Sequence, residues 1–296
     1  TGKGEAAPNV RYGESPELLL QQFNRFTEQA PPFFEDAAAI RQLCERLQMA
    51  WSLRFAIESA WHHLQSGNRR SKLQQEFGVP FCDTIPTSYT IPIMDPGVVR
   101  DFYEREHLDR FPFIKLKVNH ELAEDLTREV TGFSRQPVLL DANESFTDVE
   151  ACIRFLERIR KLPLELLEQP MPSAMLDESK YLKKYCPFPL FADEAITHDP
   201  DFDQLVQCFD GINMKLMKAG GYDQGLQILR EAKKRGLRTM IGCMVETTLG
   251  ISSALNLASL ADYIDLDSFI LLQHEPFGLL KEENGVLSFS ENEQLC

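Results

Sequence analysis

Phe113-Ile114-Lys115-Leu116-Lys117-Val118 is the stretch on which the interpretation of the whole chain depends. Apolar residues alternate in it with two lysines, which predicts a β-strand. Because successive side chains of a strand point to opposite faces, Lys115 and Lys117 share one face. A lysine beside a second cation has a lowered pKa and can act as a base. On its own, however, such a pair is more typical of the solvated face of an edge strand.

Short apolar strands alternate with amphipathic helices from Ser88 onward. We expect strands at 88–93, 112–118, 137–140, 164–167, 189–192, 212–216, 238–243 and 263–267, with helices at 98–106, 120–132, 147–160, 175–185, 200–208, 222–236 and 247–260. This alternation predicts an α/β fold, a TIM-type (β/α)7β barrel without a regular eighth helix. A doubly wound open sheet is the alternative, but it would not normally place polar residues at so many successive strand ends.

The part of the chain before the barrel carries three helical patterns, from Ser15-Pro16-Glu17 onward, at 35–48 and at 52–64, followed by a polar connection. In the third helix one apolar stripe predicts ordinary core packing, and it consists of Phe55, Ile57, Ala60, Trp61 and Leu64. We expect residues 1–82 to form an N-terminal α+β module and residues 83–275 to form the barrel. Residues 276–296, with a turn and strand at 285–289, should return to that module.

Composition narrows the class of protein. The chain has 296 residues, 43% of them hydrophobic and 26% charged, which fits an ordinary soluble globular protein. Its formal net charge of −14 argues against nucleic acid and anionic membranes as partners. Seven scattered cysteines without a C-x-x-C motif fit buried thiols in a reducing cytoplasm. They suit neither a disulfide framework nor a zinc site.

Charged residues close many of the predicted strands, at positions that meet at one rim of a parallel barrel. They are Lys115, Lys117, Asp141, Glu168, Asp193, Lys215, Asp265 and Asp267. A single Asp after a strand is more often a helix cap or a turn residue. Three carboxylates on consecutive strands, with lysines on the strands to either side, are hard to explain in that way. Such carboxylates need a cation, and an all-oxygen set without His or Cys suits Mg²⁺.

Lys117 and Lys215 would face each other across that metal. This arrangement suits removal of a proton next to a carboxylate, with one lysine as the base and the other returning a proton to the opposite face. The metal would stabilise the enediolate.

These motifs resemble those of the enolase superfamily, and in particular the dipeptide epimerases (L-Ala-D/L-Glu epimerase and relatives) of its muconate-lactonizing-enzyme subgroup. Lys115-Leu116-Lys117 is similar to the family's K-x-K motif. Three segments of this chain are similar to the family's metal-ligand segments: Asp141-Ala142-Asn143, Glu168-Gln169-Pro170 and Ala192-Asp193-Glu194. Residues 213–218 with Gly220-Gly221 are similar to the family's strand that carries the opposing lysine. Residues 2–8 and 11–14 are similar to the end of the sheet in the family's capping domain, so the resemblance covers nearly the whole chain.

The resemblance implies a Mg²⁺-dependent isomerase that inverts the α-carbon of the C-terminal residue of a dipeptide, by a two-base 1,1-proton transfer through an enediolate. Lys117 and Lys215 would be the acid/base pair, and Lys115 would stabilise the substrate carboxylate. Asp265 and Asp267 resemble the family's D-x-D motif, which holds the substrate's α-ammonium group. Met244 and Glu246 are further candidates for substrate binding. They lie where the mandelate racemase group carries a base histidine, and the lack of His there argues against that group.

Two other functions remain open. One is a lyase or cycloisomerase on the same scaffold, such as an o-succinylbenzoate synthase, which would use the same lysines and metal without an ammonium receptor. The other is a barrel that binds a ligand or partner without turnover. The lysines and carboxylates at the strand ends argue against this function.

The family begins with further strands and a mobile lid loop, which have no counterpart before Thr1. We expect them upstream in the natural protein, so the preferred dipeptide cannot be inferred. The partner should be a small molecule, the dipeptide, with no nucleic acid and no membrane. We expect a cytoplasmic location, with a homo-oligomer as one possible assembly.

Overall fold

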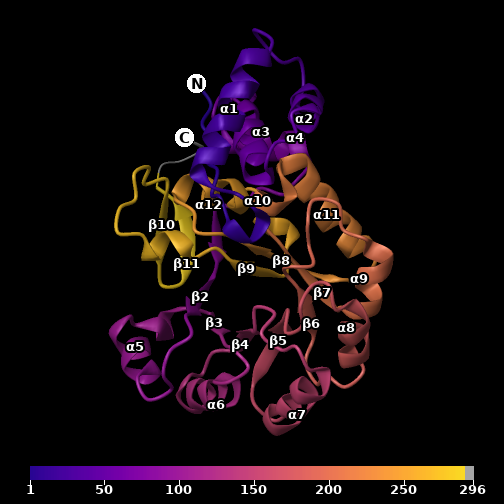
Figure 1. The fold of residues 1–296 in the computed structure, drawn as a ribbon. Coiled ribbons are helices and arrows are strands. Elements are labelled where there is room, and N and C mark those ends of the chain that lie inside the picture. The colour runs from indigo at the N-terminus through magenta and orange to yellow at the C-terminus, as the bar shows by residue number, and fades with distance from the viewer. Residues whose placement is uncertain (291–296) are drawn as a thin grey trace.

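Helices form the N-terminal part of the molecule, which lies over one end of a barrel (Figure 1). The structure is a computed structural model that describes residues 1–290, so Cys296 and the last part of the expected returning segment lie outside it. Ser15 caps the first helix by accepting a hydrogen bond from the backbone N–H of Leu18, and Pro16 takes the first helical position. The elements are η1 (Val10–Tyr12), α1 (Pro16–Gln29), α2 (Ala37–Arg46), α3 (Trp51–Gln65) and α4 (Arg70–Phe77).

Two of the expectations for this part need correction. Helix α4 occupies the predicted polar connection, and its buried face includes the polar residues Arg70 and Gln74 beside Leu73. The predicted apolar stripe of α3 is wrong at Leu64, which is 51% exposed. Helix α3 buries polar residues in place of Leu64, among them Glu58 and His62.

Eight parallel strands form the barrel in the order of the sequence, β2-β3-β4-β5-β6-β7-β8-β9. Their bounds are β2 (Ser88–Ile91), β3 (Phe113–Lys117), β4 (Val138–Asp141), β5 (Leu164–Glu168), β6 (Leu190–Ala192), β7 (Gly211–Met214), β8 (Arg238–Gly242) and β9 (Tyr263–Asp265). The predicted TIM-type fold is confirmed.

The expected helices lie between these strands. They are α5 (Val99–Arg105), α6 (Ala123–Phe133), α7 (Val149–Ile159), α8 (Leu176–Lys183), α9 (Phe202–Cys208), α11 (Tyr222–Lys234) and α12 (Thr248–Leu255). Four short helical turns complete the barrel: α10 (Leu216–Ala219), η2 (Leu108–Arg110), η3 (Ala258–Leu260) and η4 (Ser268–Leu271).

Strand register places the charged residues side by side at one rim. Lys117 is the Cα partner of Asp141, which in turn is the partner of Glu168 on the next strand. Side chains link the first and last strands, because Ser88 Oγ donates to Asp265 Oδ1 at 2.7 Å and Thr90 N donates to Asp267 Oδ2 at 2.5 Å. Below this rim an apolar layer fills the interior, and it consists of Leu139, Leu166, Phe191 and Met240.

The C-terminal tail forms a three-stranded antiparallel sheet from β1 (Thr84–Pro86), β10 (Leu280–Glu283) and β11 (Val286–Phe289). The predicted strand at 285–289 is therefore present, and it pairs with β10 and with β1, the segment that leads into the barrel. Arg70 of α4 stacks on Phe289, with 3.4 Å from the guanidinium carbon to the ring centre. The tail thus contacts both the N-terminal helices and the start of the barrel.

Carboxylates from two distant segments cap helix α12. Glu5 accepts hydrogen bonds from the backbone N–H groups of Thr247 and Gly250, at 2.9 and 2.8 Å. Glu275 accepts from the backbone and hydroxyl of Thr248, at 2.9 and 2.8 Å. Negative groups at a helix N-terminus satisfy its free N–H groups and complement the helix dipole. The start and the end of the described chain are thereby joined to the same barrel helix.

No helix among residues 1–290 combines the length and the apolar character that crossing a membrane would require.

Candidate active site

Lys115 lies at the centre of the carboxylates on the barrel rim. Its Nζ is 2.8 Å from Asp265 Oδ2, 3.0 Å from Glu168 Oε2 and 3.1 Å from Asp141 Oδ2, and its side chain is buried. Burial alone would lower the pKa of this ammonium group, but the surrounding carboxylates raise it well above its usual range. A lysine pKa lowered by the neighbouring cation, as the sequence suggested, is therefore wrong for Lys115.

Asp193 is held by two lysines from the β7–α11 connection. Lys215 Nζ donates to Asp193 Oδ2 at 2.8 Å, and Lys218 Nζ donates to Asp193 Oδ1 at 2.6 Å. Lys218 also donates to the backbone carbonyl of Asp193. Burial opposes ionisation of Asp193, yet these cations hold its pKa far below the usual range. Lys215 thus lies beside Asp193, one of the predicted metal ligands.

Lys117 ends strand β3 and is half-buried on the same face as Lys115. Lys215 follows β7, four strands further in an eight-strand barrel. The two lysines therefore approach the rim from opposite sides, with the carboxylates of β4, β5 and β6 on the arc between them.

Asp265 and Asp267 lie on this rim as well, where β9 meets β2. Asp265 is engaged by Lys115 and Ser88, and the Lys115 ammonium lowers its pKa against the effect of burial. Asp267 accepts from the backbone of Thr90, and burial together with Asp265 raises its pKa to about 6. Two buried carboxylates of different proton affinity thus lie where β9 meets β2, and one of them, Asp265, contacts Lys115.

Met244 and Glu246 lie in the loop after β8. The Glu246 carboxylate turns back onto its own loop and accepts a hydrogen bond from the Met244 backbone at 2.8 Å. Burial raises the pKa of Glu246 to about 8. The Glu246 backbone N–H donates to Ser268 Oγ at 3.1 Å, which ties this loop to the segment after β9. The contacts of Glu246 therefore shape the loop, and its role toward a substrate stays a prediction.

Asp141, Glu168 and Asp193 offer only oxygen donors, as Mg²⁺ prefers. Asp141 Oδ2 and Glu168 Oε2 are buried and accept no hydrogen bond from the described residues, although each lies within ion-pair distance of Lys115. Burial raises the pKa of Glu168 to about 8. In the part of the chain that the structure describes, these three carboxylates do not bring one oxygen each to within 4.8 Å of one another. The ammonium groups of Lys115, Lys215 and Lys218 lie among these carboxylates, and the donor chemistry and the orphaned oxygens fit a divalent cation.

Sequence reasoning missed three neighbours of these carboxylates. Asn213 Nδ2 donates to Glu168 Oε1 at 2.8 Å, and its position two residues before Lys215 in the predicted strand 212–216 could have shown that it points inward. Gln169 Oε1 accepts from the backbone of Asp193 at 2.9 Å, an interaction that no sequence pattern signals. Lys218, whose role the sequence pattern does not define, contacts the Asp193 carboxylate directly.

The N-terminal segment covers part of the rim. Arg11 forms ion pairs with Glu144, after β4, and with Glu194, after β6. Burial and the charge of Asp193 raise the pKa of Tyr12 to about 12. In Figure 1 this indigo segment lies in front of the barrel. Residues outside the barrel therefore contribute to the surroundings of the site.

Comparison with known proteins agrees with this fold. The family model described as enolase C-terminal domain-like matches residues 99–278. An L-Ala-D/L-amino acid epimerase from Pedosphaera parvula is 33% identical over 98% of this chain and 84% of its own length.

Solved structures of dipeptide epimerases are also similar to this chain. The substrate-liganded L-Ala-D/L-Glu epimerase from Bacillus subtilis superposes with a TM-score of 0.89 at 26% identity, covering 99% of this chain and 86% of the other. A dipeptide epimerase from Methylococcus capsulatus, solved with Mg and the dipeptide L-Arg-D-Lys, has a TM-score of 0.81 at 25% identity, covering 99% and 87%. The chain belongs to the enolase superfamily and, within it, to the dipeptide epimerases, a family of isomerases.

Proposed function

We propose that this protein is a Mg²⁺-dependent dipeptide epimerase that inverts the α-carbon of the C-terminal residue of its substrate. The observation that carries the proposal is the placement of Lys117 and Lys215 on opposite sides of one barrel rim, with Asp141, Glu168 and Asp193 on the arc between them. A planar intermediate held between two such lysines can lose a proton on one face and gain one on the other.

The chain's own groups have distinct roles in this proposal. In one direction Lys117, in its neutral form, takes the α-proton, and Lys215 delivers a proton to the opposite face. In the reverse direction the two exchange roles. The Lys115 ammonium binds the substrate carboxylate, for which the pKa raised by its carboxylate neighbours keeps it charged. Asp265 and Asp267 bind the free α-ammonium of the dipeptide.

Asp141, Glu168 and Asp193 would hold the Mg²⁺, as their all-oxygen chemistry favours. The ion supplies Lewis-acid stabilisation of the negative charge that develops on the substrate carboxylate. Support comes from the Methylococcus capsulatus structure, which contains Mg together with a dipeptide. Dipeptides as the substrate class are supported by that structure and by the Pedosphaera parvula relative, which is named for action on L-Ala-D/L-amino acids.

Proton exchange in D₂O tests the proposal. The purified protein with Mg²⁺ is incubated with a mixed L,L-dipeptide library, and mass spectrometry identifies the dipeptides that gain one deuterium. Exchange should vanish in Lys117→Ala and Lys215→Ala and persist in Lys161→Ala, which removes an exposed lysine from the surface. The absence of exchange in every dipeptide with intact, Mg²⁺-loaded protein would refute the epimerase.

A lyase on the same scaffold is the second candidate, and the engagement of Asp265 by Lys115 and Ser88 favours it, because that carboxylate already has protein partners. Asp267→Asn separates the two functions, since the neutral amide keeps an oxygen for the Thr90 backbone but loses the charge that attracts an ammonium. If the protein is an epimerase, Asp267→Asn should lower kcat/KM for free dipeptides to a small part of the wild-type value, and the wild type should reject N-acetylated dipeptides. A lyase acting on a substrate without an amine should be little affected.

A further inference from the structure

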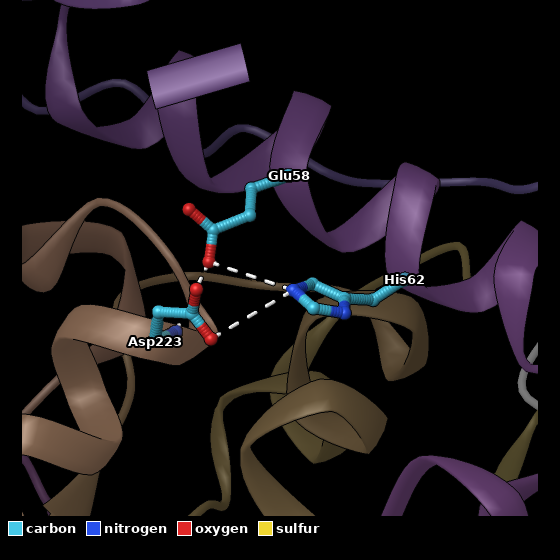
Figure 2. Close-up of side chains that lie close together, drawn as sticks. All are labelled: Glu58, His62 and Asp223. Carbon is cyan, nitrogen blue, oxygen red and sulfur yellow. Dashed lines mark hydrogen bonds and ion pairs between the residues drawn. The ribbon is translucent and has the colours of Figure 1, made fainter. Parts of the chain in front are cut away.

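Three potential metal ligands converge where the N-terminal helices meet the barrel, and none of them belongs to the rim described above (Figure 2). Glu58 and His62 lie one turn apart on α3, and Asp223 lies in the first turn of α11. His62 Nε2 is 3.9 Å from Glu58 Oε1 and 4.0 Å from Asp223 Oδ1. Within residues 1–290, this is the one set of three His, Cys, Asp or Glu side chains whose donor atoms all lie within 4.8 Å of one another.

Unpartnered buried atoms are the second observation at this cluster. His62 is 2% exposed, and neither of its ring nitrogens has a hydrogen-bond partner among the described residues. Glu58 is 1% exposed, and its Oε2 likewise accepts no hydrogen bond there. Buried polar atoms are almost always hydrogen-bonded, because an unsatisfied one costs free energy. The buried Nε2 of His62, which faces the carboxylates of Glu58 and Asp223, therefore indicates a missing partner.

The two carboxylates each divide their oxygens between two directions. Arg41 forms an ion pair with Asp223 Oδ2 and lies 3.8 Å from Glu58 Oε2, so it takes the outer oxygens. Glu58 Oε1 and Asp223 Oδ1 remain on the side of His62 Nε2, where the dashed lines of Figure 2 converge. A metal requires the lone pair of an imidazole nitrogen, and Nε2 is the His62 nitrogen that faces both carboxylates.

A third carboxylate lies behind the histidine. Glu76 Oε1, on α4, is 3.4 Å from His62 Nδ1. Metal-binding histidines commonly present their other ring nitrogen to a carboxylate, which fixes the tautomer and raises ligand basicity. Nε2, the other ring nitrogen, faces Glu58 and Asp223. Three carboxylates thus lie around His62, and Arg41 contacts two of them, those of Glu58 and Asp223.

The backbone is shaped to admit Glu58. A Cβ at Gly221 would lie only 2.3 Å from Glu58 Oε2, so glycine is required for this close approach. Glu58 Oε1 also accepts the backbone N–H of Asp223 at 3.0 Å, which holds it at the start of α11.

We propose that Glu58, His62 and Asp223 bind a zinc-like divalent transition-metal ion that joins the N-terminal helices to the barrel. Zinc ligands at about 2.0–2.1 Å in tetrahedral geometry lie about 3.4 Å from one another. The two distances to His62 are longer than this by about 0.5 Å, which side-chain rotation can supply. Water would complete the coordination. The imidazole favours a transition metal over Mg²⁺, which selects oxygen ligands.

The test uses the full chain in excess Mg²⁺, which competes with Zn²⁺ for the all-oxygen carboxylates of the rim. Titration calorimetry with Zn²⁺ should show one tight site per chain, and X-ray absorption at the zinc edge should show one imidazole nitrogen. Glu58→Gln, which is nearly isosteric, and His62→Gln should each weaken Zn²⁺ binding by at least about 100-fold. The matched control His274→Gln removes an exposed histidine and should leave the affinity unchanged.

Three results would overturn the proposal: no Zn²⁺ binding by the wild-type chain, unchanged affinity in Glu58→Gln, or a zinc edge spectrum without imidazole. If His62→Gln does not fold, Asp223→Asn replaces it, because Asp223 is partly exposed and the amide fits the same space. Zn²⁺ should also raise the melting temperature of the wild type and of His274→Gln, but not that of Glu58→Gln.

Discussion

Lys115→Met should destabilise the protein by about 3–5 kcal/mol when Mg²⁺ is chelated, the usual cost of removing one partner of a buried ion pair. Lys115 Nζ lies 2.8–3.1 Å from oxygens of Asp265, Glu168 and Asp141. Methionine keeps most of the apolar stem, so the packing loss is small. What remains is a set of buried carboxylates without their central cation.

The lower half of that range is the better expectation near neutral pH. Burial raises the pKa of Glu168 to about 8, so at pH 7 a proton can replace part of the lost positive charge. Mg²⁺ at about 100 times its Kd adds about 2.7 kcal/mol to any state that binds it. Because the variant lacks the ammonium that repels the ion, it should gain more from Mg²⁺ than the wild type does, and its deficit should shrink.

Urea unfolding in EDTA and in excess Mg²⁺ measures both effects. Lys161→Met, on the surface, is the control and should change stability by less than about 0.5 kcal/mol. A loss below about 1 kcal/mol in EDTA would show that Lys115 is not the counter-ion of these carboxylates. An equal loss with and without Mg²⁺ would show that the carboxylates around Lys115 do not bind the metal.

Three further predictions concern single residues. Asn213→Ala removes the amide that orients a predicted metal ligand and should weaken Mg²⁺ binding by about 10–100-fold in calorimetry, whereas unchanged affinity would contradict that role. Gly211→Ala places a Cβ 2.4–2.6 Å from the Phe191 ring and should cost about 1–3 kcal/mol, seen as a lower melting temperature; equal melting temperatures would disprove the clash. Burial raises the pKa of Cys44 to about 12, so at pH 8 iodoacetamide should label it far more slowly than the half-buried Cys82, as peptide mass spectrometry can show; similar rates would contradict this burial.

The barrel and much of its rim could be predicted because one pattern carries both. Each strand is a short apolar run, and several of these runs end in a charged residue, as in Leu139-Leu140-Asp141 and Leu166-Leu167-Glu168. Parallel topology then brings those ends to one rim regardless of loop details. The proximity of Lys115 to Asp141, Glu168 and Asp265 follows from this rule.

The rest could not be predicted because it depends on polar side chains that only the fold brings together. Helix α4 has few apolar residues, and its buried Arg70 and Gln74 leave no periodic signal. Helix α3 buries Glu58 and His62, whereas the apolar stripe rule predicts burial of a different face, the one that carries Leu64. Whether a charged residue is buried depends on its partners, and those lie far away in the sequence.

The capping of α12 has a consequence for the order in which the protein can form. Glu5 is synthesised well before its partner Thr247, which follows 242 positions later. Glu275, the other cap, is made later still. The last barrel helix therefore cannot acquire both caps during most of synthesis, and the early segment must wait in contact with solvent or a chaperone. Contacts of such long sequence separation slow folding, so we expect the native barrel to close only after translation of this region is complete.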